Sequence, residues 1–286
     1  MYTIGIVCSR GVGPERGGRK RNEDNYLICH DSVVTYLDRG VEKREMGGGE
    51  GSLVAVCDGM GGHVDGDVAS SAAVRVLAKL YRPGLPNNPS RALRKYILEA
   101  HKRLHWKARD RGPVSMGTTI TACWLLKEQV AWAQVGDSRL YLFRDDQLTQ
   151  LTFDHTRNEF ARRDGRTETP DGGHLAQNFI YGSRGLGDNT TLRLEMDKDV
   201  GSFDLLEGDR LLLCTDGLWG SVDDASLAEV IRHTDVPQAV AVACLERAIA
   251  RGSTDNITVM VVNVDSLDSE TDETWEDITA GDKPPV

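Results

Sequence analysis

The sequence has six cysteines but no C-x-x-C pair. The cysteines are widely spaced and most lie inside apolar runs, which is typical of reduced thiols in the core of a cytosolic protein. None of them has an arginine six residues later, so the loop in which a thiolate and an arginine bind phosphate is missing. We therefore expect neither a disulfide scaffold nor cysteine-based phosphate chemistry.

An excess of basic residues is also lacking, because 34 Lys and Arg face 44 Asp and Glu, for a net charge of -10. An acidic protein gains nothing from the phosphate backbone, so no nucleic-acid partner is expected. The start, MYTIGIVCSR, has no basic leader and apolar segment of a signal peptide, and no run approaches the ~20 apolar residues of a membrane span. We expect a soluble, cytoplasmic protein without membrane insertion.

Short strand-like runs and helix pairs are what the sequence contains instead. The helical patterns cover about residues 65–80, 90–111, 223–233 and 237–252, and they interrupt the strands in pairs without strict alternation, which favours an α+β sandwich. Ser90 is the predicted N-cap of the second helix, and a hairpin is predicted to turn at Asp145 and Asp146. The predicted strands are 3–8, 25–29, 53–58, 118–126, 129–135, 139–143, 209–214 and 257–264.

Three polar stretches interrupt these patterns. Residues 38–52 are predicted to be a Gly-rich surface excursion, and residues 155–178 a long polar loop. Residues 265–286 hold eight acidic residues against one lysine and are predicted to be a disordered acidic tail. The catalytic domain is thus expected to span residues 1–264.

Two apolar runs each end in an Asp-Gly pair: LVAV leads into CDGMGGH (57–63), and LLL leads into CTDG (214–217). Three more acidic signals stand at predicted strand ends, in RKRNEDN, QVGDSRLY and GSTDNITV. Strand ends of a sandwich can point side chains into one cleft, so we expect a shared site. The candidate residues are Arg19, Glu23, Asp24, Asp58, Asp137, Asp216 and Asp255.

Clustered carboxylates repel one another without a cation, and Mg²⁺ and Mn²⁺ prefer carboxylate, carbonyl and water ligands. Glycine after Asp58 would let a backbone carbonyl approach such an ion. Each segment alone also has a plainer interpretation: a turn for the Asp-Gly pairs and Asp137, a cap for Asp255, and a solvated face for Glu23 and Asp24. The metal-site hypothesis depends on all five segments together.

The motifs resemble those of the metal-dependent protein phosphatase family, also called protein phosphatase type 2C, and most of all its bacterial branch. Each motif alone is weak, but eight in the family's order are very specific. They span about residues 5–264 and read RKRNED, VCDGMGGH with GDVAS after it, MGTT, VGDSRLY, LTFDH, RGLG, LCTDGLWG and DNITV.

The resemblance implies a four-layer fold, in which helix pairs flank both faces of a central antiparallel β-sandwich. It also implies two Mn²⁺ or Mg²⁺ ions at one end, with a weaker third. The implied ligands are Asp58 for both ions, Glu23 and the Gly59 carbonyl for one, and Asp216 and Asp255 for the other. Asp137 is expected to share the third ion with Asp216, Asp24 to hold metal-bound water, and Arg19 to bind the substrate phosphate.

The implied reaction is hydrolysis of phosphoserine and phosphothreonine in proteins, by a metal-activated water that attacks phosphorus in line. The substrates would be phosphorylated proteins of a cognate Ser/Thr kinase, in a signalling pathway. The leaving alkoxide needs a proton from a metal-bound water or a nearby acid. His63 is a candidate acid, but Met60 occupies the place of the catalytic histidine of eukaryotic relatives, so a structural role for His63 is the other interpretation.

Two departures from the family and two other functions stay open. Gly220 stands where many relatives carry an aspartate that helps to hold the third metal, and the flap region, about 155–178, is hard to align. The chain could instead be a binding module without turnover, or a metallohydrolase that acts on phosphodiesters. The complete set of acidic motifs argues against the first alternative, and the negative charge argues against the second.

Overall fold

The computed structural model describes residues 1–60, 66–110, 116–170 and 192–267. His63, residues 171–178 of the flap region and most of the acidic segment lie outside these ranges. The helices are α1 (Gly66–Ala78), α2 (Pro89–Asp110), α3 (Arg157–Arg163), α4 (Asp216–Trp219), α5 (Asp224–His233) and α6 (Pro237–Ala250), with a short 3-10 helix at Pro14–Arg16. The strands are β1 (Tyr2–Ser9), β2 (Asn25–His30), β3 (Val33–Asp38), β4 (Val41–Met46), β5 (Ser52–Cys57), β6 (Gly59–Met60), β7 (Gly117–Thr118), β8 (Ile120–Leu126), β9 (Gln129–Val135), β10 (Arg139–Arg144), β11 (Gln147–Gln150), β12 (Val200–Asp204), β13 (Arg210–Cys214) and β14 (Ile257–Val264).

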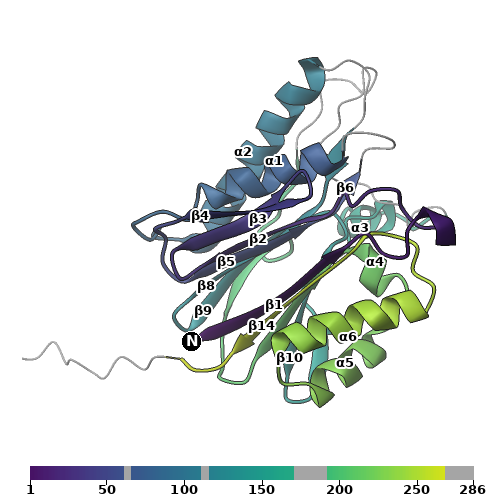
Figure 1. Ribbon diagram of the computed structural model, residues 1–286. Coiled ribbons are helices and arrows are strands. Elements are labelled where there is room, and N and C mark those ends of the chain that lie inside the picture. The colour runs from purple at the N-terminus through teal and green to yellow at the C-terminus, as the bar shows by residue number, and fades with distance from the viewer. Residues whose placement is uncertain (61–65, 111–115, 171–191, 268–286) are drawn as a thin grey trace, which may run out of the picture.

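Two antiparallel sheets form the centre of the molecule (Figure 1). One has the strand order β1-β14-β13-β10-β11, and the other has the order β12-β9-β8-β5-β2-β3-β4. Helices α1 and α2 cover the outer face of the larger sheet, and α5 and α6 cover the outer face of the smaller one. The predicted α+β sandwich with helix pairs on both faces is confirmed.

Three apolar layers hold these four layers of structure together. Leu77 and Leu93 belong to the cluster between the helices and the larger sheet, and Leu227 to the cluster under α5 and α6. Val54 and Met260 pack between the sheets. Strands covered on both faces bury every side chain, which is why LVAV reads as one apolar run instead of alternating with polar residues. No helix of the described ranges is long and apolar enough to cross a membrane.

The turn signals of the sequence act as predicted. Asp145 and Asp146 have φ angles of 52° and 61°, and they join β10 to β11. Helix α6 begins at Pro237, and Gly252 follows its end with a φ angle of 88°. All six cysteines are free, and all but Cys8 are buried.

The predicted N-cap of α2 is wrong by two residues. The Asn88 side chain accepts a hydrogen bond of 2.8 Å from the Arg91 N–H, as an N-cap does. The Ser90 hydroxyl donates instead to the Gly201 carbonyl at 3.0 Å and is buried there. Pro89, which starts the helix, suits the first helical position because it has no N–H to satisfy.

The polar stretch 38–52 is not an excursion, because Val41–Met46 forms strand β4. Every residue of β4 is exposed, and the strand pairs only with β3 at the edge of the sheet. A sequence such as VEKREM therefore has no apolar alternation to reveal it. Charged side chains on an edge strand also protect the sheet from pairing with another molecule.

The stretch 155–178 also contains structure that was not predicted. Helix α3 starts after Thr156, whose side chain accepts a hydrogen bond of 3.1 Å from the Glu159 N–H. This T-x-x-E arrangement is the start of a capping box, a signal that the polar composition obscured.

Candidate active site

The acidic residues that the sequence analysis selected all stand at one edge of the two sheets. The ends of β5, β9 and β13 and the starts of β2, β10 and β14 meet there, because paired antiparallel strands bring the end of one beside the start of the next. Asp58 follows β5, Asp137 lies in the turn between β9 and β10, Asp216 follows β13, Glu23 and Asp24 precede β2, and Asp255 precedes β14.

The two Asp-Gly pairs lie at close crossings of the chain. A β-carbon on Gly59 would lie 2.3 Å from the Glu23 carbonyl oxygen, and one on Gly217 would lie 1.9 Å from the Asn256 carbonyl oxygen. No side chain fits in either place, so only glycine lets these segments approach. The glycine of each pair therefore brings the aspartate before it against the segment that carries Glu23 or Asp255.

Glu23 and the Gly59 carbonyl face one small gap at the start of α1. A β-carbon on Gly66 would lie 2.8 Å from Glu23 Oε2 and 2.8 Å from the Gly59 oxygen. The Ser70 hydroxyl of α1 donates to the Glu23 carbonyl at 2.7 Å and fixes this segment. The pKa of Glu23 is raised by burial and by the neighbouring charge of Asp67.

Asn256 ties the segments of Glu23 and Asp255 together, a role that the sequence analysis missed. Its side-chain oxygen accepts from the Glu23 N–H at 2.9 Å, and its side-chain nitrogen donates to the Arg21 carbonyl at 2.9 Å. The only available signal was its place directly after a candidate ligand, because its partners are more than 200 residues away in the sequence.

Asp24 is buried behind these residues, with 4% of its surface exposed. Its Oδ2 accepts hydrogen bonds from the hydroxyls of Thr215 at 2.9 Å and Thr258 at 2.7 Å. Its Oδ1 has no hydrogen-bond partner among the described residues. Burial raises the pKa of Asp24 to about 7, and the charges of Asp216 and Asp255 add to the shift.

Asp58 and Asp216 lie within hydrogen-bond reach of each other. Burial and then the charges of Asp24, Asp216 and Asp137 raise the pKa of Asp58 well above its ordinary value. The pKa of Asp216 is raised by burial and by Asp255, and its Oδ1 is buried without a partner among the described residues. Two carboxyl groups this close share a proton unless a cation neutralises them.

Asp137 is fixed by its backbone to the helix that begins with Asp216. The Trp219 indole of α4 donates to the Asp137 carbonyl at 3.0 Å, and the Arg139 guanidinium lies 3.6 Å from the centre of the Trp219 ring. Burial, and next the charge of Asp216, raise the pKa of Asp137 to about 7. The turn thus adds a third buried carboxylate beside Asp58 and Asp216.

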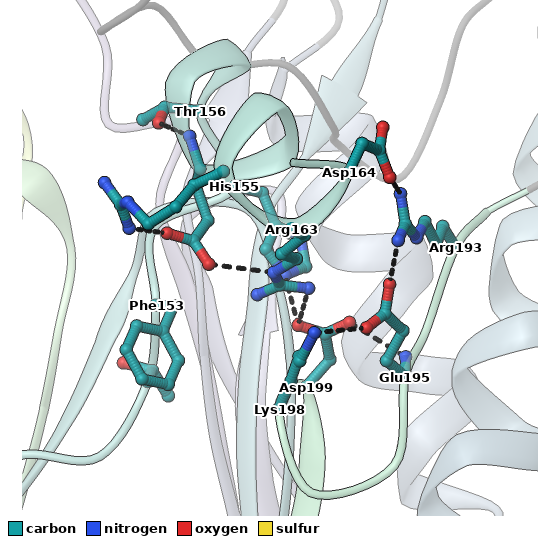
Figure 2. A network of polar contacts seen from close by, with 12 residues as sticks. Phe153, His155, Thr156, Arg163, Asp164, Arg193, Glu195, Lys198 and Asp199 are labelled. Atoms are coloured by element: carbon teal, nitrogen blue, oxygen red, sulfur yellow. Dashed lines mark hydrogen bonds and ion pairs between the residues drawn. The ribbon is translucent and has the colours of Figure 1, made fainter. Parts of the chain in front are cut away.

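A polar network that includes His155, Arg163 and Asp199 (Figure 2) holds this turn through Gly136. The Gly136 N–H donates to His155 Nδ1 at 3.2 Å, so this nitrogen carries no proton, and the other ring nitrogen donates to Asp199 at 2.9 Å. Arg163 of α3 also donates to Asp199 at 2.7 Å. His155 is fully buried in this network, as expected of a structural histidine.

Arg19 and Asp255 form an ion pair with each other. The guanidinium donates from Nε and Nη2 to the two carboxylate oxygens, both at 2.6 Å. The side chains are 58% and 33% exposed, so the pair contributes only about 0–1 kcal/mol to stability and can be exchanged for other partners. Asp255 is turned toward Arg19. Among the described residues, no group of three His, Cys, Asp or Glu side chains is arranged to hold a metal ion in this state.

The donor set fits divalent cations. Two buried carboxylate oxygens, on Asp24 and Asp216, have no partner among the described atoms. Burial, and next the repulsion of neighbouring carboxylates, raise the pKa of Asp58 and Asp216. Hard cations satisfy such oxygens and remove the repulsion. Five of the six cysteines are buried, and burial raises the thiol pKa of Cys57, which lies beside Asp58, so a thiolate nucleophile is not supported there.

Comparisons with known proteins identify the family of the chain. The sequence model of the family "Protein phosphatase 2C" matches residues 34–257. The serine/threonine phosphatase stp of Listeria innocua is 34% identical over 216 residues, which cover 73% of this chain and 83% of the relative. The protein phosphatase PhpP of Streptococcus pneumoniae is 31% identical over 258 residues, 88% of this chain and 96% of the relative.

A solved structure gives the same result for the fold. The catalytic domain of the serine/threonine protein phosphatase PstP, in complex with two manganese ions, superposes with a TM-score of 0.70 and 27% identity. The match covers 93% of this chain and 99% of that domain. The chain therefore belongs to the protein phosphatase 2C family, a family of metal-dependent phosphatases.

Proposed function

We propose that the chain is a serine/threonine protein phosphatase that uses two divalent cations, Mn²⁺ or Mg²⁺, and opposes a Ser/Thr kinase. The observation that carries the proposal is the gathering of buried carboxylates from distant parts of the chain at one edge of the sandwich. The names of the relatives and the two manganese ions of PstP support the choice of substrate and metal.

Within this proposal, Glu23 and the Gly59 carbonyl hold one ion, and Asp216 and Asp255 hold the other. Asp58 lies between the two sets and serves both. Asp137 and Asp216 hold a weaker third ion, since Gly220 offers no carboxylate beside them. The shared gap of Glu23 and Gly59 at Gly66, and the contact of Asp58 with Asp216, support this division.

Bound divalent cations supply a water of lowered pKa and neutralise the charge of the phosphoryl group. The chain contributes a rigid frame, because threonines hold Asp24 and the Thr119 hydroxyl accepts a hydrogen bond of 2.9 Å from the Asp58 N–H. Arg19 supplies the fork of donors that suits a phosphate, once it exchanges Asp255 for the substrate. The role of His63 as a proton donor stays a prediction, because His63 lies outside the described residues.

The proposal is tested by dephosphorylation of a phosphothreonine peptide. We expect turnover with Mn²⁺ that is lost on chelation and falls at least a hundredfold in Asp216→Asn, on the order of the loss when one transition-state contact is removed. Asp235→Asn is the matched control, since this aspartate is 90% exposed and pairs only with Arg210 in the described structure. No turnover of the peptide by a folded, Mn²⁺-loaded protein would favour a binding module, and hydrolysis of a phosphodiester alone would favour another metallohydrolase.

A further inference from the structure

One groove of this acidic chain is lined mainly by cations. It lies along α2, beside the end of α1, with a cavity volume of about 740 Å³. Leu98, Leu194 and Met196 give it an apolar part. Its cationic side chains include Lys79, Arg82, Arg91, Lys95 and Lys102.

These cations lack neutralising partners in the described part of the chain. Glu99 is the only carboxylate among the described lining residues, and Arg103 already pairs with it at 2.7 Å. Arg91 and Lys95 are four residues apart on the helix, so their charges repel each other. An anionic ligand on this face would therefore stabilise it.

The described chain ends at a second cavity. Ser266 and Leu267 line a second cavity of about 780 Å³ together with Tyr81. Tyr81 lies between Lys79 and Arg82 in the sequence, and both of these line the cationic groove. The segment after α1 thus contributes residues to both cavities.

The residues that follow have the complementary chemistry. Residues 268–286 contain seven Asp and Glu against one Lys, a net charge of -6. Glu276 and Asp277 separate Trp275 from Ile278, so the segment combines anionic and apolar side chains, which complement the cationic and apolar side chains of the groove. Nineteen extended residues reach up to about 65 Å, several times the length of the segment 79–82 that contributes to both cavities.

We propose that the acidic segment 268–286 docks in the cationic groove along α2. Its carboxylates pair with the free lysines and arginines, and Trp275 packs against the apolar part of the groove. The site lies away from the carboxylate cluster, because Gly66 at the start of α1 faces Glu23 while Lys79 follows the end of this helix of 13 residues, about 20 Å away. Docking leaves the cluster uncovered and does not depend on the proposed phosphatase activity.

The test is zero-length carbodiimide cross-linking of the full chain, which joins carboxylates to lysine amines only where they pair. We expect cross-links from residues 268–286 to Lys79, Lys95 and Lys102 that decrease at least about fivefold in 0.5 M salt, since salt screens exposed pairs. The variant Arg82→Glu/Arg91→Glu keeps these lysines but reverses two charges of the groove. Its cross-links from residues 268–286 to the lysines should decrease by a similar factor. Both arginines are exposed, so the fold tolerates the change, which a thermal melt verifies.

Arg39→Glu/Lys43→Glu is the matched control, because both residues are exposed on the β3–β4 hairpin outside the groove. It should keep the wild-type cross-links. Cross-links spread evenly over other lysines, or unchanged in the groove variant, would overturn the proposal. A mixture of isotope-labelled and unlabelled chains completes the test. Cross-links between a labelled and an unlabelled chain would show that the segment docks on a second copy, and they would overturn docking within one chain.

Discussion

Gly217→Ala should damage both the fold and the metal site, although alanine is the better helix former. The added β-carbon would lie 1.9 Å from the Asn256 carbonyl oxygen, and this neighbour is backbone that cannot rotate away. Overpacking of this kind costs up to about 3 kcal/mol, and the helix propensity of alanine returns at most about 1 kcal/mol. The free energy of unfolding should fall by about 2 kcal/mol, which lowers Tm by roughly 4–8 °C.

The assay is thermal unfolding together with Mn²⁺ titration calorimetry. Relief of the clash has to separate Asp216 from the segment of Asp255, so the Mn²⁺ affinity should fall at least about tenfold, the effect of misplaced ligands. Gly252→Ala is the control, because Gly252 has a φ angle of 88° and nothing within 4 Å of the added carbon. Gly252→Ala should lower the free energy of unfolding, because alanine is strained at this φ angle, and it should leave the Mn²⁺ affinity unchanged. Wild-type Mn²⁺ affinity in Gly217→Ala would refute the reasoning.

Further predictions concern three polar residues of the site. Asp24 has a pKa raised from 3.8 to about 7, so its contribution to stability is present at low pH and is lost as the pH rises through this window. Urea denaturation in the presence of a chelator measures this effect. From pH 5 to pH 7.5, the free energy of unfolding of the wild type should fall by about 2–3 kcal/mol relative to that of Asp24→Asn. The same difference between the two proteins at both pH values would contradict this. His155→Phe should cost about 3 kcal/mol in the same assay, because it leaves the Gly136 N–H unpaired and removes a hydrogen bond of buried Asp199; a loss below about 0.5 kcal/mol would show that the network is dispensable. Arg19→Lys should raise KM for a phosphopeptide about tenfold with a smaller change in kcat, because lysine cannot form the bidentate contact, and steady-state kinetics with an unchanged KM would argue against phosphate binding.

The fold could be predicted where burial leaves a mark on the sequence. The runs LVAV and ITVMVVNV are covered on both faces, so their apolar residues are continuous and their bounds agree with β5 and β14 to within one residue. The edge strand β4 could not be predicted in this way, because all its residues face solvent. Asn88 replaces Ser90 as the cap because Pro89 starts the helix, a choice that depends on contacts of Ser90 with a distant strand.

The candidate site was predictable in its residue types and not in its contacts. The spacing of acidic motifs selected Asp58, Asp216 and Asp255, but no pattern revealed that Arg19 and Asp255 bind each other. The glycine after Asp58 predicts close access of a backbone carbonyl to an ion. Its close approach to the Glu23 carbonyl is a second reason for glycine there, and it depends on a crossing of segments that the sequence does not encode locally.

The central claim is that these carboxylates hold a pair of divalent cations, and the most direct measurement is a crystal structure with Mn²⁺ and its anomalous signal. We expect two strong peaks on either side of the Asp58 carboxylate, with Glu23 and the Gly59 carbonyl bound to one, and with Asp216 and a released Asp255 bound to the other. Anomalous peaks elsewhere, or none while Arg19 still holds Asp255, would contradict it.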